Sequence, residues 1–304
     1  MSLALVEVKQ KATLLKFIEF PFDLYKNCPY YVPPLIDFEL SSLTPKNPAF
    51  EISQVKLLLA LREGVIVGRI AGIILDAEKE DKNLVRFGWI DFIDDKTVSN
   101  ALIQGVIDWA KPFGITGIHG PLGFTDFDFE GTLIEGFDEL ATQATIYNFP
   151  YYAIHFKDLG FSKACDWIEG RGVVPKELSK RMIRSASLIK ARFKLKAKKI
   201  KSKSQIKTYS KGIFQTLNNS FTNLYGFYTL TDKQIDYYVD TYFGFVRKEF
   251  VTIIVNEKDE VVACAITLPS ISKALQKAKG KLYPFGFIHL LQAFRRNDTL
   301  DMLL

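Results

Sequence analysis

The sequence predicts an α/β protein, more narrowly an α+β fold with a mixed, mostly antiparallel sheet and flanking helices, in which one unit occurs twice in tandem. Three observations predict it. A chain of 304 residues is long for one hydrophobic core and sufficient for two. Segments with apolar residues at helical spacing alternate with runs rich in branched and aromatic residues. The order strand, helix, irregular or helical insert, hairpin, strand is found in both halves, which indicates an internal repeat.

The first half contains a full set of predicted elements. They are a strand at Val6–Lys9, helices at Thr13–Tyr25 and Leu35–Leu43, a hairpin of Val55–Leu61 and Val65–Leu75, a strand at Phe87–Ile93, a helix at Thr97–Lys111, a strand at Ile115–His119, a helix at Pro150–Leu159 and a strand from Phe161 to Trp167. In the first helix, Leu14, Phe17 and Ile18 share one face. The prolines within residues 28–34 push their neighbours to extended geometry and exclude a helix there.

Turn and cap residues set the boundaries of the later elements. The run Arg62-Glu63-Gly64 between two β-rich segments predicts the hairpin. Asp95 or Thr97 caps the helix that follows the strand at Phe87–Ile93, and Pro112 with Gly114 ends that helix.

The second half repeats the order but ends early. Its elements are a strand at Arg192–Lys198, helices at Ile206–Leu224 and Asp232–Val246, a hairpin of Phe250–Val255 and Val261–Leu268, and a strand at Thr299–Leu304. Thr231 and Gln234 form a capping box at the second of these helices. The first half uses over 100 residues after its hairpin begins, and the second has 55 from Phe250. We therefore expect a second unit truncated after its fourth strand. Either the native chain continues past Leu304, or the missing part is disordered or supplied by a partner.

The bulk composition is that of a globular protein, with 48% hydrophobic and 24% charged residues. Cys28, Cys165 and Cys264 are widely spaced and form no CxxC pair, which favours a reducing compartment. No apolar run approaches the roughly 20 residues of a membrane-spanning helix, and Glu7 and Lys9 interrupt any signal-peptide core. We therefore expect a cytoplasmic protein without a membrane partner.

Positive charge is concentrated in one segment. Between Lys176 and Lys211 there are 14 Lys or Arg residues and one acid, although the whole chain has a net charge of +6. This segment either contacts phosphates of nucleic acid, CoA or anionic lipid, or is a solvated strand and linker. A nucleic-acid surface usually interleaves aromatic residues with the charges, and Phe193 alone lies near. We favour the linker and do not expect nucleic acid as a partner.

The order of elements, closing on Phe156-Lys-Asp-Leu-Gly160-Phe161, resembles the GNAT (GCN5-related N-acetyltransferase) superfamily. The segments FIEFPFDLYKNCPYYVPPL, GPLGFTDFDFEG, EGFDE and YNFPYYAIHF are similar to uncharacterised bacterial tandem GNAT-like proteins. On this resemblance, residues 1–175 form a first unit, 176–191 a basic linker and 192–304 a second unit.

The resemblance implies transfer of an acyl group from acetyl-CoA or another acyl-CoA to an amine. Such chemistry needs backbone N–H groups at a helix start for the pyrophosphate, a base and an acid. In the first half, Asp91, Asp94 and Asp95 stand where a glycine-rich loop is expected, and Phe156 replaces the tyrosine that serves as acid in many members. The first unit therefore has a degenerate cofactor loop, no cofactor-binding residue is predicted, and the catalytic residues are unknown.

Three acids and three residues around the start of the helix Pro150–Leu159 make up a candidate pocket. They are Asp126, Asp128, Glu130, Tyr147, Asn148 and Tyr151. The acids either bind a cationic substrate or metal, or lie on one side of an exposed strand, and we favour the strand. They lack the register of a calcium loop, so no metal is predicted. The aromatic residues either line a pocket or pack the start of a helix onto the sheet. We favour the packing.

The leading hypothesis is a tandem acyl-CoA-dependent N-acyltransferase, with its active site in the second half and a small-molecule or peptide amine as acceptor. A non-catalytic binding or scaffold protein that kept the fold is the alternative. A transferase that uses aminoacyl-tRNA is a third option, although no long helical arm is present. The chain also suits a homo-oligomer.

Overall fold

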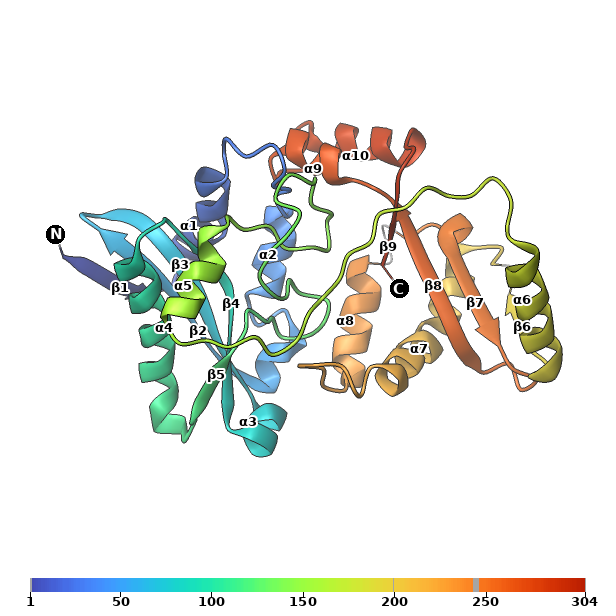
Figure 1. The fold of residues 1–304 in the computed structure, drawn as a ribbon, viewed down its shortest axis with the longest axis horizontal. Helices are drawn as coiled ribbons and strands as arrows, with labels where there is room; N and C mark the ends of the chain where they lie inside the picture. Colours follow the sequence, from blue (N-terminus) through green and yellow to red (C-terminus); the bar gives the residue numbers. More distant parts are fainter. Residues whose placement is uncertain (1, 199, 243–245, 304) are drawn as a thin grey trace. The chain divides into compact units, whose positions relative to one another are not determined.

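The computed structural model describes residues 2–198, 200–242 and 246–303 of the chain (Figure 1). The chain divides into two compact units, which are described separately. The first consists of Met1–Ala164 and Pro269–Thr299, and the second of Cys165–Leu268 and Leu300–Leu304. Residues 269–299, which the sequence repeat assigns to the second copy, therefore group with the first unit.

The first unit is built on a five-stranded sheet in the order β1-β2-β3-β4-β5. Its elements are β1 (Leu3–Glu7), α1 (Lys11–Leu24), α2 (Ile36–Ser42), the 3₁₀ helix η1 (Pro48–Glu51), β2 (Ser53–Arg62), β3 (Val65–Leu75), α3 (Asp76–Lys82), β4 (Leu84–Phe92), α4 (Lys96–Ala110), η2 (Lys111–Phe113), β5 (Gly117–His119), α5 (Tyr151–Asp158), α9 (Ser272–Ala278) and α10 (Gly286–Arg295). Strands β1 to β4 pair antiparallel with one another, and β5 pairs parallel with β4. The predicted mixed, mostly antiparallel sheet with flanking helices is confirmed.

Helix α4 supplies one side of the core. Its residues Val98, Leu102 and Val106 recur at helical spacing and are fully buried, as are Phe87 and Phe92 of β4. Burial of each such side chain contributes roughly 1.5–3 kcal/mol to folding. The apolar face of α4 therefore fixes this helix on the sheet.

Strand β4 contains a bulge and leaves part of one edge unpaired by β5. Its pairing with β3 shifts between Arg69 and Ala71, because Trp89 and Ile90 form a bulge. Its parallel pairing with β5 covers Leu84–Arg86 alone, so most of β4 extends beyond its neighbour. The loop after β5 occupies the edge that is left free.

Residues 269–299 contact the N-terminal part of the first unit through hydrogen bonds. Gln276 of α9 donates its side-chain N–H groups to the carbonyl oxygens of Pro29 and Tyr31, over 2.8 and 2.9 Å. The backbone N–H of Ile36 donates to the Gly280 oxygen at 2.9 Å. These contacts span more than 240 residues of sequence, which is why local pattern did not predict them.

The second unit has a four-stranded sheet in the order β6-β7-β8-β9. Its elements are α6 (Lys180–Arg192), β6 (Lys196–Lys198), α7 (Lys203–Ser220), α8 (Asp232–Tyr242), η3 (Lys248–Phe250), β7 (Val251–Val255), β8 (Val261–Pro269) and β9 (Leu300–Met302). The predicted capping box is confirmed, since Thr231 N donates to Gln234 Oε1 at 3.0 Å and Gln234 N to Thr231 Oγ1 at 3.3 Å. The order strand, two helices, hairpin, strand matches that of the first sheet.

Several sequence predictions differ from the structure. The strand expected from Phe161 to Trp167 is absent, and that segment is irregular. Helix α6 occupies the stretch predicted as a linker, and α3, α9 and α10 were not predicted. The predicted end of helix 232–246, residue Leu304 of the last strand and Lys199 of the basic segment lie wholly or partly outside the described residues. No helix within the described ranges is long and apolar enough to cross a bilayer.

Candidate functional site

The loop of residues 120–131 lies directly against the free edge of β4. The backbone N–H of Leu122 donates to the Phe87 oxygen at 2.8 Å. A Cβ atom at Gly88 would lie 2.3 Å from the Leu122 oxygen, so this position of the strand accepts glycine alone. Gly120 has a φ of 145°, which an L side chain rarely adopts. The glycines thus allow two backbones to approach each other closely and fix the path of the loop.

The three acids of this loop do not form the exposed strand that the alternation predicted; that interpretation is wrong. Residues 120–131 contain no strand, and Asp126, Asp128 and Glu130 are all half-buried. Asp128 Oδ2 accepts from the backbone N–H groups of Phe124 at 2.8 Å and Thr125 at 3.2 Å. The loop therefore folds back on itself around a carboxylate.

Two carboxyl oxygens in this loop are buried without a hydrogen-bond partner. They are Oδ1 of Asp126 and Oε1 of Glu130. Buried polar atoms without partners are rare, and each calls for an explanation such as a bound ligand. In the part of the chain that the structure describes, no group of three or more His, Cys, Asp or Glu side chains is arranged to hold a metal ion.

The burial changes the acidity of all three groups. Burial raises the pKa of Asp128 to about 7 against the effect of its backbone hydrogen bonds. Burial, together with repulsion from Asp126, raises the pKa of Glu130 to about 8. Burial likewise raises the pKa of Asp126 above its ordinary value. Carboxyl groups that titrate near neutral pH suit general acid and base catalysis.

A fully buried ion pair lies beside the loop. Arg86 Nε donates to Glu78 Oε2 at 2.7 Å, and Arg86 Nη1 donates to the Gly123 oxygen at 3.0 Å. His119 Nε2 lies 3.1 Å from the same Glu78 oxygen. Although burial raises the pKa of Glu78, the hydrogen bonds from His119 and Arg86 outweigh it and hold that pKa below its ordinary value. Because Glu78 neutralises much of the Arg86 charge, Arg86 offsets the negative charge of the three loop acids only in part.

A further carboxyl group reaches this region from α2. Trp89 has a φ of 43° within the β4 bulge and donates its indole N–H to Glu39 Oε2 at 2.8 Å. The Trp89 ring also packs on Phe124, with centroids 5.7 Å apart. A positive φ is a rare conformation for a bulky residue and marks local strain. Burial raises the pKa of Glu39, and its charge also raises the pKa of Asp128.

Sequence reasoning missed Glu39, Glu78, Arg86 and Trp89. Arg86 did carry a signal, since it stands in an otherwise apolar strand where a charge needs a buried partner. The conformation of Trp89 carries no signal in the sequence.

The other three candidate residues, Tyr147, Asn148 and Tyr151, form hydrogen bonds with groups outside the acidic loop. Tyr147 donates its hydroxyl to the Phe137 oxygen at 3.0 Å, and Tyr151 donates to the Phe92 oxygen at 2.5 Å. The Asn148 side-chain oxygen accepts from Leu133 N at 2.7 Å. None of these hydrogen bonds reaches the three acids. The grouping of all six residues in one pocket stays a prediction.

The start of α4 is the place where a CoA pyrophosphate is expected. A hollow of about 320 Å³ lies there, lined by Lys96, Thr97, Ser99, Asn100, His155, Asp158 and Leu159. However, Asp95 Oδ1 accepts from Thr97 N at 2.8 Å, and Asp95 O accepts from Val98 N and Ser99 N. The predicted cap is thus present, and it already engages the N–H groups that would hold a phosphate.

The charges around this helix start also oppose a phosphate. The hydrogen bonds from Thr97 and Arg62 lower the pKa of Asp95 to about 2, so its carboxylate stays ionised. Asp94 lies 3.0 Å from His155 Nε2. Phe156 is buried against Phe87 and Phe161 and has no proton to donate. These residues do not fit an acyl-CoA bound in the usual way of the GNAT superfamily.

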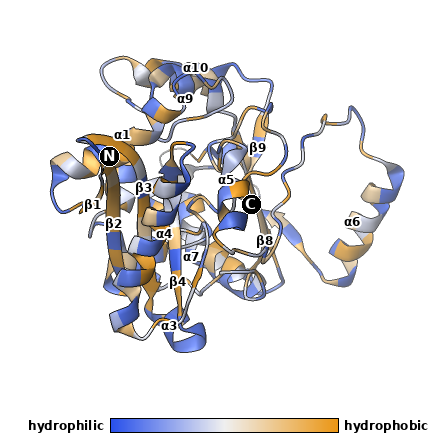
Figure 2. Cartoon of the chain, turned by 60° about the vertical axis from the view of Figure 1, so that its left-hand side comes forward, coloured by the Kyte–Doolittle hydropathy of each residue, from blue (hydrophilic) through white to orange (hydrophobic). Residues whose placement is uncertain are grey.

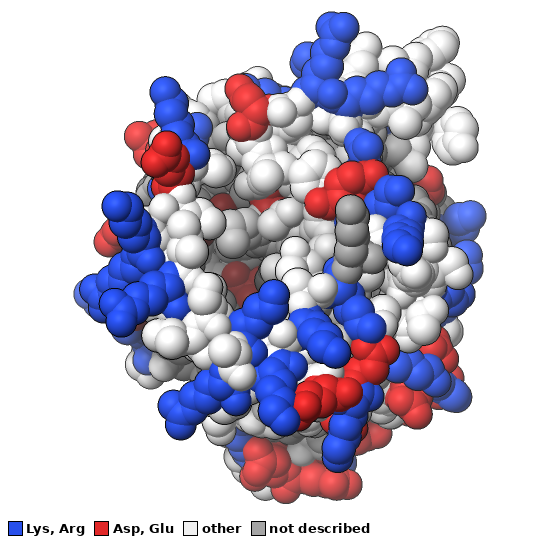
Figure 3. Space-filling view, turned by 90° about the vertical axis from the view of Figure 1, so that its right-hand side faces the viewer, with Lys and Arg blue, Asp and Glu red and all other residues white. Residues whose placement is uncertain are grey.

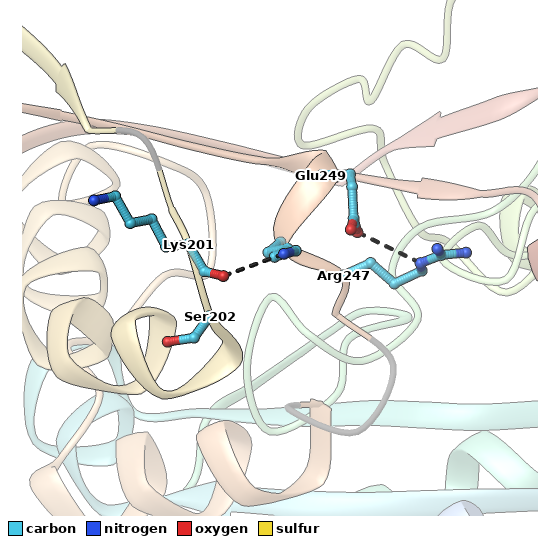
Figure 4. A pocket seen from close by; sticks show the side chains of 5 residues that line it. Lys201, Ser202, Arg247 and Glu249 are labelled. Carbon is cyan, nitrogen blue, oxygen red and sulfur yellow. Dashed lines mark hydrogen bonds and ion pairs between the residues drawn. The ribbon is translucent and has the colours of Figure 1, made fainter.

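The second unit has a smaller, basic hollow of about 280 Å³ near the start of α7 (Figure 4). Lys248 Nζ donates to the Lys201 oxygen at 3.1 Å, and Arg247 Nε lies 3.6 Å from Glu249 Oε2. Ser202 caps α7 through Gln205 N. The cationic groups of Arg247 and Lys248 therefore already have partners at the hollow.

Among solved structures, the chain resembles a tandem GNAT protein from the clavulanic acid biosynthesis pathway, at 12% identity and a TM-score of 0.45, over 88% of this chain and 74% of that one. It also resembles a predicted acetyltransferase with acetyl-CoA from Clostridium acetobutylicum, at 12% identity and a TM-score of 0.35, over 56% and 96%. A third likeness is to AAC(6')-Iy in complex with a bisubstrate analog, at 14% identity and a TM-score of 0.34, over 57% and 100%.

No family model matches the sequence. The chain is 29% identical over 291 residues to Protein YghO of Escherichia coli. The match covers 92% of this chain and 72% of the relative. It is 28% identical over 298 residues to a protein of Caulobacter vibrioides named Bacterial ceramide synthase, which covers 95% of this chain and 76% of the relative. By sequence, the chain is thus similar over more than nine tenths of its length to two bacterial proteins.

Proposed function

We propose that this protein is an acyl-CoA-dependent N-acyltransferase and that the loop of residues 120–131 receives the acceptor amine. The observation that supports this most directly is the pair of buried, unpartnered oxygens of Asp126 and Glu130. An ammonium group has three N–H donors and no acceptor, so it complements such a pair. Its charge would also relieve the repulsion between these acids.

The acidity of the loop suits the proton transfer that the reaction requires. An ammonium group must lose a proton before its nitrogen can attack an acyl group. The pKa of a free alkylamine is about 10, and burial raises that of Glu130 to about 8. Glu130 in its ionised form can therefore accept the ammonium proton, and the CoA thiolate that leaves the acyl group takes up a proton and departs as free thiol. We assign Glu130 the role of base and Asp126 that of a second contact to the ammonium group.

One relative indicates the class of acceptor. The Caulobacter vibrioides protein is named a ceramide synthase. A ceramide is the amide of a fatty acid with a long-chain amino alcohol, so its synthesis joins an acyl group to an amine. We propose the same reaction class for this chain, with a long-chain amine as acceptor. Because the start of α4 does not suit a pyrophosphate, we assign the acyl donor to no residue of the first unit.

The test is an acyl-transfer assay with the full chain, a long-chain acyl-CoA and a long-chain amino alcohol. Free thiol release gives the rate, and mass spectrometry identifies the amide. General base catalysis typically contributes about 10²–10⁴-fold to the rate. We therefore expect Glu130→Gln to slow the reaction at least about 100-fold. Glu135→Gln is the matched control, because Glu135 is an exposed acid in the following segment. Equal rates in the two variants would contradict the role of Glu130, and no amide with the wild type would contradict the function.

A second candidate is a non-catalytic binding protein that kept the fold. Asp95 at the start of α4 and Phe156 in α5 favour it, because neither can serve an acyl-CoA or a leaving thiolate. Thermal shift separates the two candidates. A ligand at a hundred times its Kd stabilises by about 2.7 kcal/mol. A shift with the amine and none with acyl-CoA supports the binding protein, whereas shifts with both support the enzyme.

A further inference from the structure

Helix α6 is exposed along its whole length. Each of the 13 residues from Lys180 to Arg192 has an exposed side chain. Figure 2 shows hydrophilic and hydrophobic residues side by side on this helix. Exposed apolar residues also precede it, with Val173 at 95% and Val174 at 80% exposure. Such a concentration of exposed apolar side chains on a protein surface marks an interaction site.

Most apolar and basic residues of α6 lie on different faces, although Leu188 falls among the basic residues and Lys190 among the apolar ones. Met182, Ala186 and Ile189 follow each other at spacings of four and three residues, so they form one stripe along the helix. Phe193 and Ile183 extend this stripe, and four of these five residues are large and more than half exposed. The opposite face contains Lys180, Arg181, Arg184 and Arg192. Between Leu178 and Lys194 the chain has no acidic residue.

This arrangement does little to stabilise the helix in water. Lys180 and Arg181 stand at the N-terminal end, where positive charge opposes the helix dipole. Lys180 and Arg184 are four residues apart, and like charges at that spacing repel. The Ser179 cap at Met182 N and the last-turn Lys190 and Arg192 act in the other direction. With no buried face, a 13-residue helix is marginal in water, so its residue pattern calls for a partner.

We propose that α6 binds the surface of a membrane that contains anionic lipids. A basic helix with a separate apolar face lies in the plane of the bilayer interface, with its apolar side among the acyl chains and its cations at the headgroups. At about 20 Å, α6 has the length for such a contact. The proposal concerns surface binding and departs from our expectation of no membrane partner, which rested on the lack of a spanning segment.

Charge and apolarity together select this partner over others. A nucleic acid would engage the cations but would leave the stripe of Met182, Ile183 and Ile189 in water. A second copy of the helix would cover the stripe but would leave the cations of the opposite face without an anionic partner. An anionic bilayer satisfies both faces. Figure 3 shows Lys and Arg side chains, with Asp and Glu side chains among them, around uncharged surface on the face that it draws. The proposal does not depend on the acyltransferase function.

The test is co-sedimentation of the full chain with vesicles. We expect binding to vesicles of equal parts phosphatidylglycerol and phosphatidylcholine, and at least tenfold weaker binding to phosphatidylcholine alone. Lys180→Gln/Arg184→Gln should lower the partition coefficient roughly tenfold or more. The control is Lys273→Gln/Lys277→Gln on α9, which has the same spacing and exposed side chains; it should bind like the wild type. Met182→Gln/Ile189→Gln tests the apolar stripe and should also weaken binding at least tenfold.

Three outcomes would overturn the proposal. The first is failure of the wild type to sediment with anionic vesicles while its circular dichroism shows a folded chain. The second is equal loss in the α6 and α9 charge variants, which would indicate that net charge alone is responsible. The third is undiminished binding of Met182→Gln/Ile189→Gln together with binding to duplex DNA, which would assign α6 to nucleic acid. Because all variants lie on exposed surface, their melting temperatures should match the wild type.

Discussion

Gly123 and Asp128 touch each other across the loop of residues 120–131. A Cβ atom added at Gly123 would lie 2.1 Å from Asp128 Cβ, closer than real Cβ contacts allow. The carbonyl oxygen of Gly123 also accepts from Arg86 Nη1 at 3.0 Å. The position of Asp128 therefore depends on a glycine that is itself anchored to the buried Arg86.

The first prediction follows from this contact. Gly123→Ala should destabilise the first unit by about 1–3 kcal/mol, because the new methyl group forces Asp128 out of its place. In a unit of this size that lowers the melting temperature by several degrees, at roughly 2–4 °C per kcal/mol. Gly170→Ala is the control, since a Cβ there meets open space. Scanning calorimetry gives the comparison, and equal melting temperatures in both variants would contradict the close packing.

The second prediction concerns pH. The pKa of Glu130 is about 8 and that of Asp128 about 7 in the folded state, above the ordinary values near 4. The folded state therefore holds these protons more tightly than the unfolded state. Their contribution to stability is fully present below about pH 4 and is lost as pH rises through 7 to 8. We expect the melting temperature of the wild type to fall between pH 5 and pH 9 relative to that of Glu130→Gln.

The measurement is a series of thermal melts at constant ionic strength. Glu135→Gln again serves as control, because Glu135 is exposed. Its melting temperature should follow the wild-type curve across the series. If Glu130→Gln also follows that curve, Glu130 does not titrate near neutral pH, and its proposed role as base fails with it.

The third prediction tests what occupies the start of α4. Asp95→Ser keeps a side-chain oxygen for Thr97 N but removes the negative charge and the ion pair with Arg62. We expect a loss of stability within about 1 kcal/mol, because the cap is retained and a single, partly exposed ion pair contributes little. Inorganic pyrophosphate should bind the variant more tightly than the wild type, by isothermal titration calorimetry. Unchanged or weaker binding would show that Asp95 does not exclude phosphate.

The parts of the fold that follow from neighbouring residues were predictable. Asp95 as a cap, the Thr231–Gln234 capping box and the Arg62-Glu63-Gly64 turn depend on contacts within a few residues. The alternation of Asp126, Asp128 and Glu130 suggested a strand, because an extended chain has the same period of two. What decided the outcome was the closeness of Gly88 to Leu122, a contact between distant segments that no local pattern encodes.

Long-range contacts also explain the remaining differences. Gln276 binds the carbonyl oxygens of Pro29 and Tyr31, and so α9 groups with the first unit although its sequence lies in the second half. The many charges in the composition of α6 favour a linker. Its apolar stripe at helical spacing was present in the sequence and would have identified an amphipathic helix.

The fourth prediction concerns the buried pair of Arg86 and Glu78, whose side chains are both fully excluded from solvent. Arg86→Met should destabilise the first unit by about 3–5 kcal/mol, because it leaves the Glu78 carboxylate without its main partner. Glu78→Leu leaves the Arg86 cation and should cost about as much. The double variant should recover much of the loss, since an apolar pair of similar volume is often as stable as a buried ion pair. Urea unfolding of the four proteins gives the coupling energy directly. A double variant that loses the sum of both single losses would show that the pair is not coupled and that Arg86 acts chiefly by holding the Gly123 oxygen.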